Sequence, residues 1–261
     1  MNLMTQYAAR PYVLAETTWK IVRDTDYSVA VLPWGATEAH NYHMPYATDN
    51  FQADHVMIRA ARLAWEAGAK TIVLPCIPFG VNTGQLDIKL CINMSPSTQL
   101  AVLQDVATVV HNAGIDKLVI ANGHGGNHFK QMLRELSLSH PDLFACSINW
   151  WQAADGATFF DEPGDHAGEL ETSVIMHIAP ELVRPLSEAG DGAAKSFKLA
   201  GFHQAWASAP RAWTQVTEDT GDGNPQASTA EKGEKFIAAT SENIAQFLVE
   251  LAATGVNQMY E

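Results

Sequence analysis

The chain alternates short apolar runs with longer stretches of helical periodicity, and this order constrains its fold more than any other feature. Apolar, β-branched runs predict buried strands over residues 27–35, 71–80, the first half of 117–127, and 143–151. Helical spacing predicts helices over residues 51–68, 95–112, from after 127 to about 139, 166–179 and 229–253. Because strands alternating with helices form parallel sheets covered on both faces, we expect a three-layer α/β/α fold with a mostly parallel sheet, in one domain of residues 1–261.

Two segments depart from this alternation. Residues 86–93, LDIKLCIN, alternate apolar with polar side chains, which predicts a half-exposed strand at an antiparallel edge. Residues 185–227 are irregular and rich in Gly, Pro, Ser and Asp. Irregular segments of this length usually belong to a binding site or a subunit contact, and we expect one of these roles here.

Composition restricts the classes of function. The formal net charge is −13 and no run is rich in Lys and Arg, which argues against nucleic acid or an anionic membrane as partner. No apolar run reaches the ~20 residues that span a bilayer, and the N-terminus lacks the order of a secretory signal. Cys76, Cys91 and Cys146 form no C-x-x-C pair, which predicts neither a disulfide framework nor a cysteine zinc site. We therefore expect a cytoplasmic protein that acts on a small molecule.

Polar and aromatic residues gather where the predicted strands end. Glu38 and His40 follow the first strand, His124 follows the third, and Trp150 and Trp151 end the fourth. Ligands of open parallel α/β sheets bind just beyond the carboxyl ends of the strands. The spacing of two between Glu38 and His40 places both on one side of an extended chain. These residues therefore predict one site at this edge of the sheet.

Two further residues of the first loop have more than one interpretation. Asp49 directly precedes a predicted helix, so it is an N-cap, a metal ligand, or both, since one oxygen can cap while the other binds metal. His43 is either an alternative ligand or a residue that supports a ligand from behind.

The turn NGHGGN, residues 122–127, has a competing interpretation. A Gly-rich turn between strand and helix can hold phosphate on its backbone N–H groups. The sequence is neither G-x-G-x-x-G nor a P-loop, and a phosphate cradle does not require His124. A non-catalytic metal- or nucleotide-binding α/β protein therefore remains an alternative to an enzyme.

The stretch DHAGELETS, residues 165–173, contains two glutamates of different expected roles. On a helix, His166 and Glu169 share a face, and Glu171 lies ~200° from Glu169. We therefore expect Glu169 at the metal side and Glu171 in a supporting role, ordering nearby backbone or meeting another subunit. An early-helix glutamate is also explained by the helix dipole alone.

Four segments together resemble the creatininase (creatinine amidohydrolase) family. They are LPWGATEAHNYHMPYATD, NGHGGN, HAGELETS and TGDGNPQASTAEKG, in the family's order, and they cover the chain from the first strand to the last helix. The resemblance implies an α/β/α hydrolase with two divalent metal ions per subunit, zinc, manganese or iron. It implies cleavage of a C–N bond in a small cyclic amide, lactam or formamide, and a homo-oligomer, a hexamer built as a trimer of dimers.

The resemblance also implies roles for single residues. The metal ligands matched are Glu38, His40, Asp49, His124 and Glu169, with Asp49 bridging both ions, and His166 matches a catalytic histidine. Creatinine hydrolases carry a ligand glutamate where this chain has Gly126, and an apolar residue at position 169. The chain therefore resembles the broader family, and creatinine is a poor candidate substrate. Asn41-Tyr42 replaces the usual Gly-Pro, and residues 81–97 lack the usual F-P-G-T-like segment, which leaves the substrate open.

These expectations define a mechanism. A ligand set of nitrogen and oxygen suits Zn²⁺, Mn²⁺ or Fe²⁺, and two ions ~3.5–4 Å apart hold a hydroxide that attacks the carbonyl. The backbone of Gly125 or Gly126 would stabilise the oxyanion, and His166 would protonate the leaving group. Trp150 or Trp151 would stack on the substrate unless it only packs the core, and Tyr42 lies where we expect substrate preference. An alternative is ring opening of a cyclic ketone or lactone, such as an oxidised sugar or cyclitol, on the same metals.

Overall fold

A four-stranded parallel sheet forms the centre of the computed structural model, which describes residues 9–261. The strands lie in the order β2-β1-β3-β4. Their bounds are Val29–Trp34 for β1, Thr71–Val73 for β2, Lys117–Asn122 for β3 and Phe144–Asn149 for β4. Val31 is in register with Val73 on one side and Val119 on the other. Every residue of β1 and β3 is buried, as a parallel sheet covered on both faces requires.

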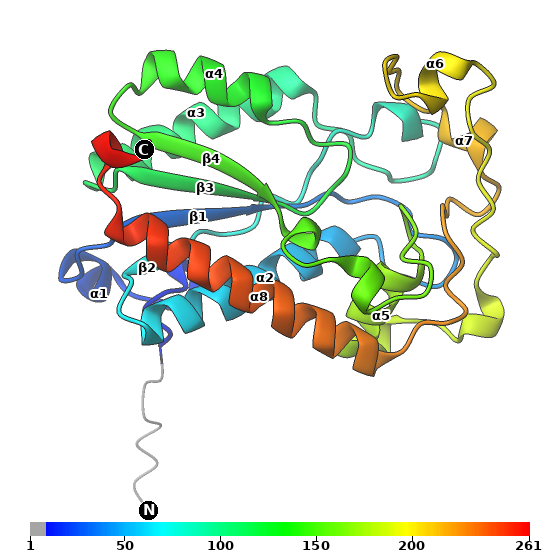
Figure 1. Cartoon of the computed structure of the whole chain (residues 1–261), viewed down its shortest axis with the longest axis horizontal. Helices are drawn as coiled ribbons and strands as arrows, with labels where there is room; N and C mark the ends of the chain where they lie inside the picture. The colour runs from blue at the N-terminus through cyan, green and yellow to red at the C-terminus, as the bar shows by residue number, and fades with distance from the viewer. Residues whose placement is uncertain (1–8) are drawn as a thin grey trace, which may run out of the picture.

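Helices cover both faces of this sheet (Figure 1). Helices α2, Thr48–Glu66, α5, Glu169–Ile178, and α8, Ala230–Ala253, lie on one face. Helices α3, Pro96–Asn112, and α4, Lys130–Ser139, lie on the other. Successive strand residues point to opposite faces, so Val31 and Val119 pack under α2 and α8 whereas Leu32 and Ile120 pack under α3 and α4. The predicted three-layer α/β/α fold is confirmed.

Short helices lie at the periphery. Helix α1 spans Trp19–Arg23, α6 spans Ala200–His203 and α7 spans Trp213–Val216. None of the helices between residues 9 and 261 is both long and apolar enough to cross a bilayer.

The segment that follows β2 differs from its prediction. A strand was expected over 71–80, but β2 ends at Val73, and Pro75 and Pro78 then remove two ladder donors. The chain still runs beside β1, because the Ile77 N–H donates to the Pro33 carbonyl at 3.0 Å. This extension carries residues 80–94 over the carboxyl edge of the sheet.

The edge strand predicted over residues 86–93 is wrong. Thr83–Gln85 forms a single 3₁₀ turn, labelled η2, and tight turns follow it. Ile92 joins Thr37 by one isolated antiparallel bridge, and Leu86 and Leu90 are exposed. The apolar–polar alternation therefore does not reflect a buried face here, and the segment instead caps the site described below.

Residues 185–227 are irregular, as predicted, and Asp219 holds two parts of this segment together. Asp219 accepts hydrogen bonds from the N–H groups of Gly192 and Gly221 and from the hydroxyl of Thr217. Asn41 has a φ of 53°, a left-handed conformation that asparagine tolerates, and its side-chain Oδ1 accepts a hydrogen bond from the Gly190 N–H at 2.8 Å. The motif departure at Asn41 thus anchors this long segment beside the first loop.

Candidate metal centre

Carboxylates and imidazoles meet beyond the carboxyl ends of β1 and β3. The six residues are Glu38, His40, Asp49, His124, His166 and Glu171. All are buried except Glu171, whose side chain is 19% exposed. They come from the loop after β1, the first turn of α2, the loop after β3 and the start of α5. The predicted convergence at this edge of the sheet is therefore present for Glu38, His40 and His124, which Asp49, His166 and Glu171 join.

Asp49 offers one carboxylate oxygen to each of two groups. Its Oδ1 lies 3.0 Å from Nε2 of His40, which is 3.9 Å from Oε2 of Glu171. Its Oδ2 lies 3.1 Å from Nδ1 of His124, which is 2.8 Å from Oε1 of Glu38. The ligand-type atoms of each group lie within 4.8 Å of one another. Two of the three sets of donors share Asp49, and the third set consists of Glu38, His40 and His166.

Two carboxylate oxygens of this cluster are buried without a well-directed hydrogen bond. Among residues 9–261, Oε1 of Glu38 and Oδ2 of Asp49 receive no well-directed hydrogen bond, although His124 faces both. A buried polar atom left unsatisfied costs about 1–3 kcal/mol, so such atoms call for a bound partner. Divalent cations would satisfy both oxygens, and a donor set of nitrogen and oxygen without thiolate suits zinc, manganese or iron. The residues fit two such ions.

The charges in the cluster also favour cations. Burial alone would lower the pKa of His40, but Asp49, Glu171 and Glu38 outweigh it and raise this pKa to about 10. The pKa of His124 is likewise raised against burial by Glu38 and Asp49. Burial opposes ionisation of Asp49, yet His40 and His124 hold its pKa below the usual value. Protonated imidazoles thus balance the carboxylates, and metal ions would replace those protons.

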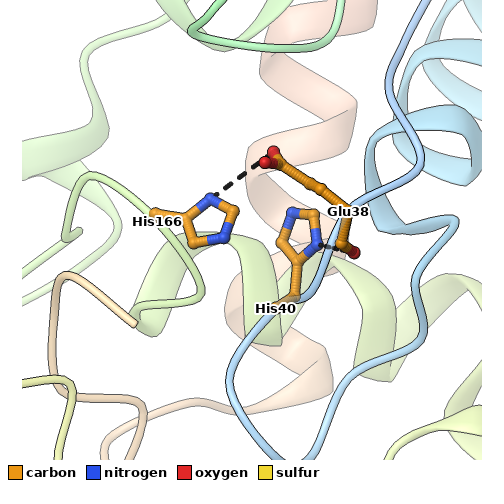
Figure 2. A group of neighbouring side chains, drawn as sticks. All are labelled: Glu38, His40 and His166. Carbon is orange, nitrogen blue, oxygen red and sulfur yellow. Dashed lines mark hydrogen bonds and ion pairs between the residues drawn. The ribbon is translucent and has the colours of Figure 1, made fainter. Parts of the chain in front are cut away.

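His166 faces the cluster with one ring nitrogen. Its Nε2 lies 2.8 Å from the Ala39 carbonyl and donates to it, which leaves Nδ1 directed at the cluster. Nδ1 lies 3.8 Å from Oε1 of Glu38 (Figure 2). The ring centroid lies 4.2 Å from that of His40 and 4.9 Å from that of Trp213. The imidazole is therefore held in one orientation beside the predicted metals.

The structure places Glu171, and not Glu169, beside the cluster. Helix α5 begins at Glu169, so His166 precedes the helix, and Ala167 between them has a φ of 53°. The predicted shared face of His166 and Glu169 therefore does not exist. Glu169 pairs with Lys232 and accepts the Glu162 N–H at 2.9 Å, away from the cluster. Glu171 instead reaches His40, while also ordering the Ala167 backbone as predicted.

His43 lies behind the cluster and does not join any set of donors. Its Nε2 is 2.9 Å from Oγ1 of Thr172, the neighbour of Glu171. Burial, reinforced by the charge of His40, lowers the pKa of His43 to about 4, so its ring is neutral. This position suits the supporting role and disfavours the alternative of a ligand.

The cluster opens into a cavity of about 590 Å³. Trp151 and Gly125 line it, whereas Trp150 borders it but is 1% exposed and packs in the core against Phe236. Tyr42 does not: its side chain is exposed and its hydroxyl donates to the Glu218 carbonyl at 3.0 Å. The substrate role predicted for Tyr42 is therefore not supported by its position, because the chain turns outward after Asn41.

Sequence reasoning missed much of the cavity wall, including Gln85, Arg211 and Trp213. The guanidinium of Arg211 pairs with Asp165 and Asp222 at 2.8 Å each and lies 4.5 Å from the ring centre of Trp213. Both segments that supply these residues are irregular, so no periodicity marks them. The only available signal was the length of the 185–227 segment, which indicated a binding role.

The Gly-rich turn does not present a phosphate cradle. The His124 N–H is taken by Oδ1 of Asn122 at 3.1 Å, and the Asn127 N–H by the His124 carbonyl at 3.1 Å. These two donors are used within the turn, and the His124 ring points into the cluster. The nucleotide-binding alternative therefore has no support from this geometry.

Comparisons with known proteins identify the family and the fold. The family model for creatininase, described as creatinine amidohydrolase, matches residues 15–248. A putative creatinine amidohydrolase from Bacteroides fragilis is 41% identical, with 96% of this chain and 99% of that chain covered and a TM-score of 0.89. A mycofactocin precursor peptide peptidase of Mycobacterium ulcerans is 28% identical over 166 residues, which span 59% of each protein. A mutant creatininase described as Zn-Zn type is 22% identical, with 93% and 98% covered and a TM-score of 0.75, and shares the fold.

Proposed function

Because this chain belongs to the creatininase family of metal-dependent amidohydrolases, we propose that it hydrolyses a C–N amide bond at a centre of two divalent metal ions. One observation carries the proposal: Asp49 directs one carboxylate oxygen to each of two neighbouring sets of donors. A carboxylate shared in this way is the expected bridge of a two-metal site. The name of the Zn-Zn creatininase supports zinc, and the donor set accommodates manganese or iron as well.

The ligands divide into two sets. Glu38, Asp49 and His124 would hold one ion, and His40, Asp49 and Glu171 the other. Two such ions supply Lewis-acid activation of a carbonyl and of water at neutral pH. The carboxylates keep both ions in place because their oxygens are buried and converge within a few ångströms.

In this proposal, His166 carries a proton from the attacking water to the leaving nitrogen of the amide. Its Nδ1 faces the cluster and would accept the proton that water loses on attacking the amide carbonyl, because Nε2 is fixed by the Ala39 carbonyl. The same nitrogen then returns the proton to the leaving nitrogen of the amide, which must not depart as an anion. Trp213 packs on the ring and limits the water that reaches it. Positioned proton transfer of this kind contributes typically 10²–10⁴-fold in rate.

The substrate is a small amide, lactam or formamide that can extend beyond a single ring. The cavity of about 590 Å³ falls in the range that accommodates drug-sized ligands. Trp151 and Trp213 supply flat apolar walls for a planar group. The name of the mycobacterial relative, a precursor peptide peptidase, adds peptide amides to the candidates.

The test is a metal-loaded activity screen. The protein is stripped with a chelator, reloaded with Zn²⁺ or Mn²⁺, and incubated with lactams, formamides and short peptides in water labelled with ¹⁸O. Label is expected in the product carboxylate of one class, with two ions bound per chain. Binding of fewer than two ions, or absence of hydrolysis across the panel with both ions bound, would contradict the proposal.

A further inference from the structure

Gln85 is buried against the carboxylate of Glu38. It ends the turn η2, is 2% exposed, and lines the cavity. Its side-chain Nε2 donates a hydrogen bond to Oε2 of Glu38. We propose that Gln85 is a positioning residue, which fixes the Glu38 carboxylate so that only Oε1 is presented to a metal ion. This inference rests on the metal centre proposed above.

The amide of Gln85 is itself held by Cys91. The thiol of Cys91 donates to Oε1 of Gln85 at 3.2 Å, and its sulfur accepts the N–H of Ala39 at 3.2 Å. Ala39 directly follows Glu38, so the hydrogen bonds form a closed circuit. The circuit runs from the Glu38 carboxylate through Gln85 and Cys91 back to the backbone beside Glu38. Rotation of the Glu38 side chain would break at least one of these bonds.

The segment that carries Gln85 is clamped near the same point. The N–H of Asn82 donates to Oδ1 of Asn93 at 2.8 Å, and the N–H of Ile92 donates to the Thr37 carbonyl at 2.9 Å. Thr37 directly precedes Glu38. The turn containing Gln85 and the loop containing Glu38 therefore form one packed unit, and the amide reaches the carboxylate from a fixed position.

The chemistry of an amide suits this task. A glutamine side chain has no charge, so it leaves the negative charge of the Glu38 carboxylate available to a metal ion. Its donor occupies Oε2, and Oε1 remains directed at Nδ1 of His124, 2.8 Å away. Carboxylate ligands are commonly oriented by such hydrogen bonds, and loss of the partner typically costs 10–100-fold in metal affinity.

The variant that isolates this role is Gln85→Met, which keeps the length of the side chain and removes the donor. Zn²⁺ is titrated into the metal-free protein against a chromophoric chelator. We expect two binding events in the wild type, and in the variant a 10–100-fold loss for one ion with the other unchanged. The visible spectrum of Co²⁺ in the weakened site should also change, which a loss of general stability would not cause.

Cys91 supplies an independent pair of variants. Cys91→Ser retains a donor and an acceptor and should keep wild-type Zn²⁺ affinity, whereas Cys91→Ala should weaken the same ion. Cys146→Ala is the control, because Cys146 is also a partly buried free thiol but lies on β4 away from the circuit. If Gln85→Met fails to fold, the Cys91 pair tests the same circuit.

The outcomes separate this inference from the proposed function. Unchanged affinity of both ions in Gln85→Met, or equal loss of both, overturns the positioning role while the metal centre stands. If the Gln85 variant does not fold, equal affinities in Cys91→Ala and Cys91→Ser overturn it. A wild type that binds no Zn²⁺ would instead refute the metal centre.

Discussion

Glu169 and Glu171 are separated by one residue on α5, yet their carboxylates serve different parts of the molecule. Oε2 of Glu171 lies 3.9 Å from Nε2 of His40, at the cavity. Glu169 is ion-paired with Lys232, at the start of α8. Residues two apart on a helix are ~200° apart around its axis. The first turn of α5 therefore directs Glu171 to the cluster and Glu169 to Lys232 on α8.

This division predicts opposite phenotypes for two matched variants. Glu171→Gln should weaken one of two Zn²⁺ ions by about 10–100-fold, because a neutral amide replaces an anionic donor. Glu169→Gln should keep both ions and lower the melting temperature of the metal-free protein, because the ammonium of Lys232 loses its buried partner. Chelator competition and differential scanning calorimetry measure the two effects. Loss of an ion in Glu169→Gln alone would restore the ligand assignment suggested by its sequence position.

Removal of the Asp49 carboxylate, which two sets of donors share, should weaken metal binding more than removal of Glu38 or of Glu171. Asp49→Ala is expected to abolish tight binding of both ions, since Asp49 contributes an oxygen to both of these sets. Metal analysis after gel filtration provides the count. Retention of both ions at full occupancy would show that Asp49 does not bridge them.

His166 should be separable from metal binding. His166→Ala is expected to retain both ions and to lower kcat by roughly 10²–10⁴-fold on any substrate found in the screen. Metal content and kcat are measured on the same sample. Loss of an ion together with activity would instead identify His166 as a metal ligand, since its Nδ1 lies 3.8 Å from Oε1 of Glu38.

Gly84 predicts an effect on substrate binding rather than on metals. A Cβ at Gly84 would overlap the Arg211 carbonyl, so Gly84→Ala should push the segment carrying Arg211 and Trp213 away from the cavity. We expect kcat/KM to fall about tenfold or more with both ions retained. Gly156→Ala is a suitable control, because a Cβ there meets neighbours only at 3.6 Å or beyond. Equal kinetics for the two variants would mean that the wall tolerates the displacement.

Asp219 predicts a pH dependence of stability. Burial opposes its ionisation, but hydrogen bonds from Gly192, Gly221 and Thr217 hold its pKa below the usual value. A depressed folded pKa means that the stabilisation is complete above the unfolded pKa of about 3.9 and is lost as the pH falls through the folded pKa.

The corresponding variant is Asp219→Asn, studied by urea unfolding with a chelator present. It should be less stable than wild type by about 1–3 kcal/mol at pH 7, and the difference should shrink toward pH 3. Asp26→Asn changes an exposed aspartate and should match wild type at both pH values. A difference for Asp219→Asn that stays constant from pH 7 to pH 3 would exclude the ionised carboxylate as its cause.

The sequence was sufficient for the layers of the fold and for most of the cluster. Buried strands and amphipathic helices have strong periodicity, and residues at the ends of parallel strands must converge, which brings Glu38, His40 and His124 together. Helical spacing favours Glu169 over Glu171 as the metal ligand only if the helix includes His166, and α5 begins after it. Its true start depends on the left-handed Ala167 and on the bridge from His166 to Asp222, both set by tertiary contacts.

Much of the cavity wall could not be predicted, because irregular segments supply it. Gln85, Arg211 and Trp213 lie in segments whose path is determined by side-chain hydrogen bonds, such as those to Asp219 and between Asn82 and Asn93. Such contacts leave no period in the sequence. The alternation of apolar and polar residues at 86–93 wrongly predicts a strand, because Leu86 and Leu90 are exposed to solvent and do not pack on a sheet face.

The sheet order has a consequence for how proteins of this kind diversify. β1 and β3, the two inner strands, are followed by the loops with Glu38, His40 and His124, whereas the irregular segment that carries Arg211 lies outside the sheet. Insertions, deletions and substitutions in that outer segment reshape the cavity without disturbing the inner ladder. Descendants can therefore inherit the reactive centre intact and acquire new substrates through the parts of the chain that the core does not constrain.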